Sequence, residues 1–371
     1  MKPKLVVVAD TYYPKVDGVL IFMEEFLRRA HHDFDLRLLV PAFSKEKKID
    51  SLKITFLDVY YKMKMFTYEG IKINVKNIRK IKEAVYDANT IFIQELGPVG
   101  IIALHYAQKY GKKKVLYVHN TPWDFLSKYF SLNRFWSEII KQFFVRWYNK
   151  SDILLIPYPG LIDEIRIAGV HAEMQVARLG VDISRFSPLK DKDKAKTKLQ
   201  LPLKPIIGYV GRISNEKNTL TLLHAFKKLG RKDAILLMVG DGRTELVKKF
   251  RESRNVIVTG FVNNVEEYLQ AMDLFVMPSL TETTSLATLE AMATGLPVIV
   301  TKVGFMKNYI IKDHNGIFFP RNSVSLLSLK MDNLLRKSEL RERLGQNARK
   351  TVTSNFTWEK SINKIKKFLD G

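Results

Sequence analysis

The 371-residue chain contains no cysteine. This absence excludes disulfide bonds, thiolate metal ligands and cysteine nucleophiles, and it fits a reducing compartment. The chain also lacks long apolar runs: near the N-terminus the apolar run is Leu5–Ala9, five residues. Such a run is too short for a signal-peptide core, and no later run approaches the roughly 18–20 residues that a membrane-spanning helix needs. We therefore expect a cytoplasmic protein that begins with a buried strand.

Motifs for nucleic-acid and metal binding are missing as well. We find no RNP-type aromatic strand, zinc-finger spacing or GXXG clamp, and no clustered Asp or His typical of a metal site. The aspartate-x-aspartate pattern occurs only as Asp191 and Asp193, in a charged run that we interpret as solvated. The net charge of +23 nevertheless favours an anionic partner, whether a phosphate ligand, an anionic lipid surface or nucleic acid. A lysine-rich proteome would give the same charge.

The length indicates about two domains. Strand and helix patterns alternate over residues 4–176 and again from residue 206, which predicts two parallel, doubly wound sheets. Between them the charged, proline-containing run 190–205 is typical of an interdomain linker that could hold a short helix. We place an N-terminal domain at residues 1–187, a C-terminal domain at 188–353, and a final helix at 354–371 that crosses back to the first domain.

The stretch Ser279–Val300 carries two glutamates, Glu282 and Glu290, eight positions apart. Its pattern predicts a loop, a helix from about Thr284, a turn and a buried strand. A helix N-terminus attracts anions, so a phosphate there, flanked by two carboxylates that accept hydrogen bonds from sugar hydroxyls, would form a nucleotide-sugar pocket. The alternative is an amphipathic helix with a solvated Glu290 and a capping Thr, and this stretch alone does not separate the two.

Two more loops follow expected strands in the second half. Arg212 and Lys217 lie in the first, and together they suit a diphosphate, since Arg can bind two oxygens and Lys adds a point charge. The second, Gly240–Gly242, permits close approach of a ligand. Because ligands bind beyond the carboxyl ends of parallel strands, we expect both loops at one ligand site. The alternative for the two cations is a solvated surface.

Five segments resemble the retaining glycosyltransferases of the group 1 family: GYVGRISNEKN, LLMVGDG, VTGFV, MPSLTETTSLATLEAMATGLPVIVTKVG and HNGIFF. The fourth contains the E-x7-E pattern of that family. In the first half PKVDGV, the strand-end His119 and the GVD segment before the charged run are similar too. The resemblance implies a GT-B fold of class α/β, with two doubly wound, Rossmann-like domains that face each other across a cleft.

The resemblance also implies residue roles. Arg212 and Lys217 would hold the donor diphosphate, Glu290 the ribose hydroxyls, and Glu282 the transferred sugar. The implied catalytic residues are His119, Arg212, Lys217 and Glu282, and the implied donor-binding residues are Gly18, Gly211, Gly240, Gly242, Gly260, Phe261, Val262, Thr284, Ser285, Leu286 and Glu290. Thr284 and Ser285 stand where the family often has glycine, which leaves the donor sugar open. A structural role for His119, hydrogen-bonded at a strand end, is the alternative.

The implied chemistry is transfer of a hexosyl unit from a UDP- or GDP-sugar, with retention at the anomeric carbon. Members of the family need no metal and no cofactor, since the nucleotide sugar is a co-substrate. Retention is ascribed to attack from the face of the leaving group, so no protein nucleophile is required. A GT-B epimerase or phosphorylase and a non-catalytic basic nucleic-acid binder are the other functions that we consider.

The segment Trp123–Lys150 indicates the kind of acceptor. Ten of its 28 residues are aromatic, and its five Lys or Arg residues outnumber its two acidic residues. Aromatic rings with interleaved cations are typical of a helix in a membrane interface. We therefore expect a peripheral protein on the inner face of an anionic membrane and a lipid acceptor such as diacylglycerol or phosphatidylinositol. The expected contacts are Trp123, Lys128, Trp136, Arg146 and Trp147. The alternatives are a soluble or polysaccharide acceptor and aromatics that pack the core.

Overall fold

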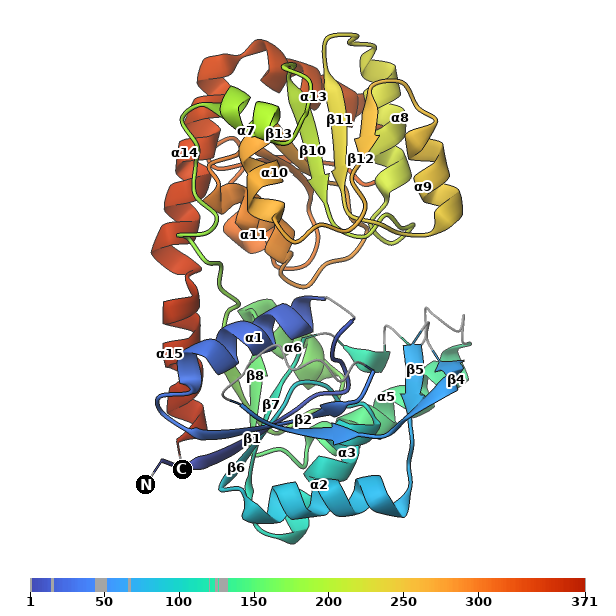
Figure 1. Cartoon of the computed structure of the whole chain (residues 1–371), viewed down its shortest axis with the longest axis vertical. Coiled ribbons are helices and arrows are strands. Elements are labelled where there is room, and N and C mark those ends of the chain that lie inside the picture. The colour runs from blue at the N-terminus through green and yellow to red at the C-terminus, as the bar shows by residue number, and fades with distance from the viewer. Residues whose placement is uncertain are drawn as a thin grey trace. The chain divides into compact units, whose positions relative to one another are not determined.

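The computed structural model of the chain forms two compact units, each of which is considered by itself (Figure 1). The first unit comprises Met1–Arg178 and Glu359–Gly371, and the second comprises Leu179–Trp358. The structure describes residues 2–14, 17–43, 52–65, 68–119, 121–123, 126 and 133–370.

The first unit is built on seven parallel strands in the order β3-β2-β1-β6-β7-β8-β9. Every residue of β6 and four of the five in β1 are buried, because a parallel sheet is covered on both faces. A separate antiparallel pair joins β4 (Val59–Met65) and β5 (Tyr68–Ile71). The sheet strands are β1 (Lys4–Val8), β2 (Asp35–Pro41), β3 (Lys53–Leu57), β6 (Thr90–Ile93), β7 (Lys113–Tyr117), β8 (Ile153–Ile156) and β9 (Glu173–Val176).

Helices α2 and α3 cover one face of this sheet, and α1 and α15 lie together on the other (Figure 1). Asp17 starts α1 by accepting hydrogen bonds from the amides of Val19 and Leu20, both 3.1 Å. Helix α15 is held by this unit, since Thr90 Oγ1 donates to Leu369 O at 3.1 Å. The helices are α1 (Gly18–Ala30), α2 (Val75–Asp87), α3 (Pro98–Lys109), α5 (Arg134–Tyr148), α6 (Pro159–Ile167) and α15 (Trp358–Leu369).

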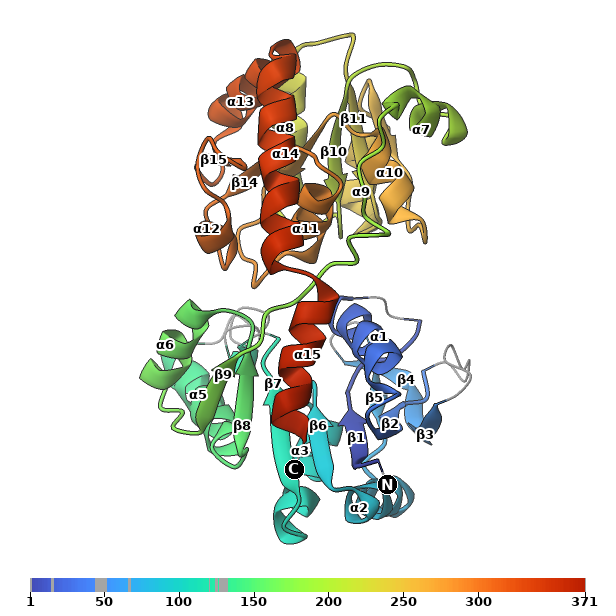
Figure 2. The same ribbon diagram turned by 90° about the vertical axis from the view of Figure 1, so that its left-hand side faces the viewer.

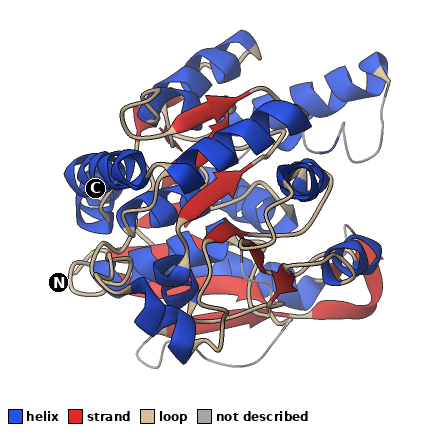
Figure 3. Ribbon diagram, turned by 90° about the horizontal axis from the view of Figure 1, so that it is seen from above, coloured by secondary structure: helices blue, strands red, loops and turns tan. Residues whose placement is uncertain are grey.

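The second unit holds six parallel strands in the order β12-β11-β10-β13-β14-β15. Helices α8 and α13 pack together on one side of this sheet, and α7 and α10 on the other (Figure 2); Figure 3 distinguishes the helices from the strands that they cover. The strands are β10 (Ile206–Val210), β11 (Ile235–Val239), β12 (Val256–Val258), β13 (Leu274–Met277), β14 (Val298–Thr301) and β15 (Ile317–Phe319). The helices are α7 (Lys192–Lys198), α8 (Thr219–Leu229), α9 (Thr244–Arg251), α10 (Val265–Ala271), α11 (Leu286–Ala293), α12 (Met306–Tyr309), α13 (Val324–Arg336) and α14 (Ser338–Asn355).

The α/β class with two doubly wound sheets is as expected. In each unit the strand order reverses once, between β1 and β6 in the first and between β10 and β13 in the second. Loops diverge at such a switch point, and it is the usual place for a ligand in this architecture. None of the described helices combines the length and the apolar character that crossing a bilayer requires.

The charged run after Pro188 forms the short helix that we allowed for, but it is not the solvated linker that we expected. The structure places it inside the second unit, where it forms α7 beside α10. Asp191 caps this helix by accepting from the amides of Asp193 and Lys194, so its carboxylate has a structural role. Lys196 is 5% exposed and its ammonium lies 3.3 Å from the carboxylate of Asp273. The run is therefore partly buried, because an ion pair compensates the lysine.

Asn315 in the HNGIFF segment ties three parts of the second unit together, and it is fully buried. Its amide group donates to Tyr309 O (2.9 Å) and Thr351 Oγ1 (3.0 Å), and its oxygen accepts from the amide of Ile311 (2.6 Å). Asn315→Ala leaves buried polar groups unpaired, so we expect it to lower stability by about 2–4 kcal/mol. Thermal unfolding of this variant should show a clearly lower Tm. The exposed Asn308→Ala serves as control, and equal Tm values for the two variants would contradict the role of Asn315.

Candidate active site

Two loops of the second unit are joined where its strand order reverses. Lys217, in the loop after β10, forms an ion pair of 2.7 Å with Glu282, in the loop after β13. Backbone contacts accompany it, since the amide of Leu280 donates to Glu216 O at 3.0 Å, and Asn218 Nδ2 donates to Pro278 O at 3.2 Å. The loops therefore form one continuous polar surface, as expected for a site at the carboxyl ends of parallel strands.

The carboxylate of Glu282 is held by two donors. Besides Lys217, Ser279 Oγ donates to its Oε1 at 2.8 Å, and the glutamate side chain is only 8% exposed. Arg212 of the first loop is exposed, and no carboxylate of the described residues pairs with it. Among the described residues, the site thus offers a cation paired with a fixed carboxylate, Lys217 with Glu282, and in Arg212 an exposed cation on the same loop as Lys217.

Helix α11 begins at Leu286, whereas the sequence predicted a start near Thr284. The reason is Ser285, whose φ of +62° places it in the left-handed region, so the loop turns once more before the helix starts. Ser285 Oγ lies 2.8 Å from Thr288 Oγ1, and Tyr309 donates to Thr284 O at 2.8 Å. Thr284 and Ser285 are therefore fixed ahead of the first free amides of α11.

Glu290 lies within α11 and is partly buried. Burial raises the pKa of its carboxyl group to about 7, because desolvation disfavours the charged form. The positive charge of Arg185 acts in the opposite direction, and the negative charge of Glu266 adds to the increase. Glu290 therefore takes up a proton near neutral pH, which the sequence did not indicate.

Glycines bring three loops close together. A Cβ on Gly240 would lie 2.2 Å from Gly211 O, and one on Gly242 would lie 2.0 Å from Ile213 O. Isolated bridges join Ile213 to Gly242 and Gly240 to Gly260. The sequence assigned Gly240 and Gly242 to ligand approach, but the structure shows that they are needed for packing of loop against loop. The neighbouring Phe261 is 62% exposed, and Val262 follows it.

The first unit places His119 directly after β7. Its Nε2 lies 3.2 Å from Gln94 Oε1, and its ring packs against Phe22 and Tyr117. Burial lowers the pKa of His119 to about 3, although the negative charge of Asp17 opposes this shift. The imidazole is therefore neutral at physiological pH and acts as a hydrogen-bonding group. Gly18, the first residue of α1, follows Asp17.

Of the residues expected to contact the acceptor or the membrane, some lie in the core and others on the surface. Trp123 is buried and meets Tyr148 edge to face, so this ring packs in the core, as the alternative held. Trp136 is 53% exposed and Arg146 is exposed on α5. Lys150 stacks over the ring of Trp147, with its Nζ 3.9 Å from the ring centroid. Lys128 lies outside the described residues.

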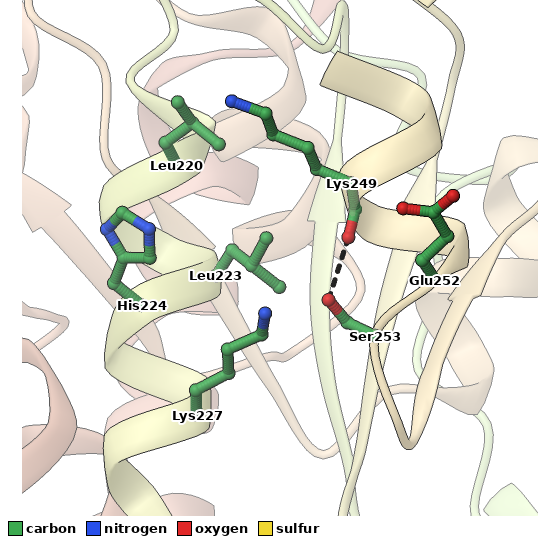
Figure 4. Close-up of a pocket in the computed structure, with 7 residues that line it drawn as sticks. All are labelled: Leu220, Leu223, His224, Lys227, Lys249, Glu252 and Ser253. Atoms are coloured by element: carbon green, nitrogen blue, oxygen red, sulfur yellow. Dashed lines mark hydrogen bonds between the residues drawn. The ribbon is translucent and has the colours of Figure 1, made fainter. Parts of the chain in front are cut away.

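A cavity of about 380 Å³ lies between α8 and α9 (Figure 4). It is lined by Leu220, Leu223, His224, Lys227, Lys249, Glu252 and Ser253. None of the expected donor-binding residues lines it, so it is separate from the joined loops. Within the described part of the chain, no three His, Asp or Glu side chains are grouped as a metal site requires.

Comparison with known families agrees with this geometry. Residues 191–351 match the family model described as "Glycosyl transferases group 1". The match contains both joined loops and α11. This part of the chain therefore matches the group 1 glycosyltransferases, which agrees with the group 1 resemblance seen in the sequence.

Individual relatives are similar over part of their length. The chain is 31% identical over 230 residues to sulfoquinovosyl transferase SQD2 of Arabidopsis thaliana, covering 59% of this chain and 44% of that protein. It is 29% identical over 205 residues to the UDP-Gal:alpha-D-GlcNAc-diphosphoundecaprenol alpha-1,3-galactosyltransferase of Escherichia coli, covering 50% of this chain and 51% of that protein. The matches thus span about half the length of these relatives.

The fold is GT-B. The structure of Anabaena Alr3699/HepE in complex with UDP superposes with a TM-score of 0.81 over 99% of each chain, at 15% identity. The sequence had missed Arg185, Ser279 and Gln94, which the structure brings to the candidate residues. Arg185 lies in the GVD segment, but nothing in its spacing points to Glu266 or Glu290.

Glu290 makes a prediction about stability and pH. Its pKa is about 7 in the folded protein against an ordinary value of 4.5, so the carboxyl group destabilises the fold progressively as pH rises from 4.5 to 7. Glu290→Gln removes this penalty. We therefore expect the difference between the Tm of this variant and the Tm of the wild type to grow by a few degrees, in favour of the variant, as pH rises from 4.5 to 8. Glu282→Gln should instead lower the Tm at pH 8, because Lys217 loses its partner. Parallel Tm-against-pH curves for wild type and Glu290→Gln would contradict the prediction.

Proposed function

We propose that this protein transfers a hexosyl unit from a nucleotide-diphosphate sugar to an acceptor hydroxyl, with retention at the anomeric carbon. The observation that carries the proposal is the pair of loops joined by Lys217 and Glu282 at the switch point of a group 1 glycosyltransferase domain. Cations, helix amides and two carboxylates of different environment meet there. This combination suits a ligand with a diphosphate at its centre and hydroxyl groups at both ends.

In the proposed reaction, Arg212, Lys217 and the amides of Thr284, Ser285 and Leu286 stabilise the charge that develops on the departing diphosphate. The bond between the anomeric carbon and the diphosphate oxygen breaks, and its electron pair leaves with the diphosphate. The acceptor oxygen bonds to the same face of that carbon, and its proton passes to the departing phosphate. No metal and no protein nucleophile takes part.

The two glutamates bind different ends of the donor. Glu290 accepts hydrogen bonds from the ribose hydroxyls, and Glu282 accepts from the transferred sugar. Because Lys217 and Glu282 are paired with each other, donor binding exchanges partners: the lysine turns to the phosphates and the glutamate to the sugar. The desolvation of these charges is then compensated by the ligand. His119 and Gly18 are proposed to serve the transferred sugar and the acceptor from the first unit.

We favour a uridine nucleotide as the donor. The name of the Escherichia coli relative specifies UDP-Gal, and the Anabaena protein was solved with UDP. A GDP-sugar is the alternative. The base would lie against Gly260–Val262, where Phe261 offers an exposed ring.

The proposed acceptor is a membrane lipid. Phe135, Trp136, Ile139 and Phe143 are exposed on α5 at 67%, 53%, 44% and 48%. The last three recur at helical spacing, so they share one face. The same helix carries Arg134 and Arg146. Such a face suits an anionic bilayer surface, and the name of the Escherichia coli relative specifies a lipid-linked acceptor. A soluble or polysaccharide acceptor is the alternative.

Donor binding is tested with two alanine variants. We expect UDP or a UDP-sugar to raise the Tm of the wild type. Lys217→Ala and Glu290→Ala should lose that shift and reduce UDP release from the sugar donor by about 100-fold or more, since each removes a direct ligand contact. Lys228→Ala, on the outer part of α8, removes the same charge and should behave as wild type. Absence of stabilisation by uridine, guanosine and adenosine diphosphates alike would refute the proposal.

The membrane proposal is tested separately. We expect the protein to sediment with phosphatidylglycerol vesicles and not with phosphatidylcholine vesicles. The double variant Trp136→Ala/Phe143→Ala should bind the anionic vesicles about tenfold more weakly, because it removes the exposed rings of α5. Tyr86→Ala, which removes an exposed ring on α2, is the matched control. Failure of the wild type to bind these vesicles, with donor binding intact, would favour a soluble acceptor.

A further inference from the structure

The segment Asp182–Ser187, at the start of the second unit, is fixed by side chains from two helices, α14 and α10. Arg349 of α14 donates to Ile183 O (3.1 Å) and Phe186 O (2.5 Å), and also to Ala293 O at the end of α11. Gln270 of α10 donates to Ser187 O at 3.0 Å. These contacts tie the segment to α10 and α14, so the side chains that it carries have defined positions.

Within this segment, Asp182 Oδ1 accepts from the amides of Ser184 (3.1 Å) and Arg185 (3.0 Å), which closes a tight turn. The turn presents the guanidinium of Arg185 to the start of α10. Arg185 Nε and Nη2 both donate to Glu266 Oε2, at 2.9 and 2.7 Å. Nη2 also donates to Asn263 O at 2.8 Å. One side chain thus binds both a carboxylate and a backbone carbonyl.

Asn263 directly follows Gly260–Val262, the segment proposed to lie against the base. Arg185 therefore holds the end of that segment, and Gly240 bridges its beginning at Gly260. The charge of Arg185 also reaches Glu290, where it opposes the effects of burial and of Glu266. From α14, Arg349 engages backbone carbonyls at the end of α11. Arg185 is thus the cation that acts on Glu290 among the described residues.

We propose that Arg185 is a positioning residue for the nucleotide: by donating to Asn263 O it fixes the end of the base segment, and from its ion pair with Glu266 its positive charge acts on the ribose-binding Glu290. The inference rests on the proposed function, because it assumes that Glu290 and Gly260–Val262 bind the nucleoside. Arg185 does not touch the reacting atoms. It acts through Glu290, which must carry its negative charge to accept from both ribose hydroxyls, and through the backbone of Asn263.

The test is the affinity for UDP, measured by calorimetry between pH 5.5 and pH 9. In the wild type, affinity should rise through about pH 7, where Glu290 loses its proton. In Arg185→Gln the rise should move to higher pH, so that UDP binds about fivefold more weakly at pH 7 and recovers most of that loss at pH 9. Glu266→Gln removes the repelling charge and should move the rise to lower pH. A purely structural role would weaken binding equally at every pH.

Arg336→Gln on α13 is the matched control, since it removes an exposed arginine that pairs with Asp332. It should leave the UDP titration unchanged. If wild type binds UDP but Arg185→Gln and Glu266→Gln keep its pH profile, the inference is overturned while the proposed function stands. If wild type binds no nucleoside diphosphate at any pH, the proposed function fails as well. Because Glu266→Gln retains the arginine, it decides the matter even if Arg185→Gln does not fold.

Discussion

The proposed donor site depends on the ion pair between Lys217 and Glu282, which joins the loops after β10 and β13. Strands β10 and β13 are neighbours, yet the chain leaves them for different helices, α8 and α11. Two loops that diverge in this way need a direct contact with each other if they are to bind one ligand. The ion pair supplies that contact, and the backbone bond from Leu280 to Glu216 supports it. The same two side chains are then available as ligand contacts.

The two glutamates of the E-x7-E pattern are in opposite electrostatic situations. Glu282 has Lys217 and Ser279 as donors. Glu290 is desolvated, and within the described residues the structure gives its carboxylate no hydrogen-bond donor, which is why its pKa rises to about 7. A carboxylate that weakens the fold without a compensating contact is typical of a functional site. Its natural compensation is a pair of hydroxyl groups on a ligand.

Sequence reasoning predicted the alternation of strands and helices in both halves, because β-branched and leucine runs between turn residues are distinctive. It predicted Lys217, Glu282 and Glu290 through their motifs. It did not predict the contacts that join one loop to another. The left-handed Ser285 shortened α11, the glycines proved to serve loop packing, and Arg185 had no visible partner. Each of these depends on contacts between segments that are distant along the chain, which periodicity does not report.

In the first unit, too, polar side chains that follow adjacent strands meet near the point where the strand order reverses, but here the side chains are uncharged. Gln94 and His119 follow the adjacent strands β6 and β7, next to the point where the strand order reverses, and they meet at 3.2 Å. Packing against Phe22 and Tyr117 keeps the imidazole neutral, so it cannot stabilise the departing diphosphate as a cation. Gln94 Oε1 accepts from Nε2 when that nitrogen carries the proton, and Nδ1 is then the nitrogen that can accept a hydrogen bond from a hydroxyl. In the proposed reaction, charge stabilisation is therefore assigned to Arg212, Lys217 and the amides at the start of α11, and the proposed role of the histidine is to orient a sugar.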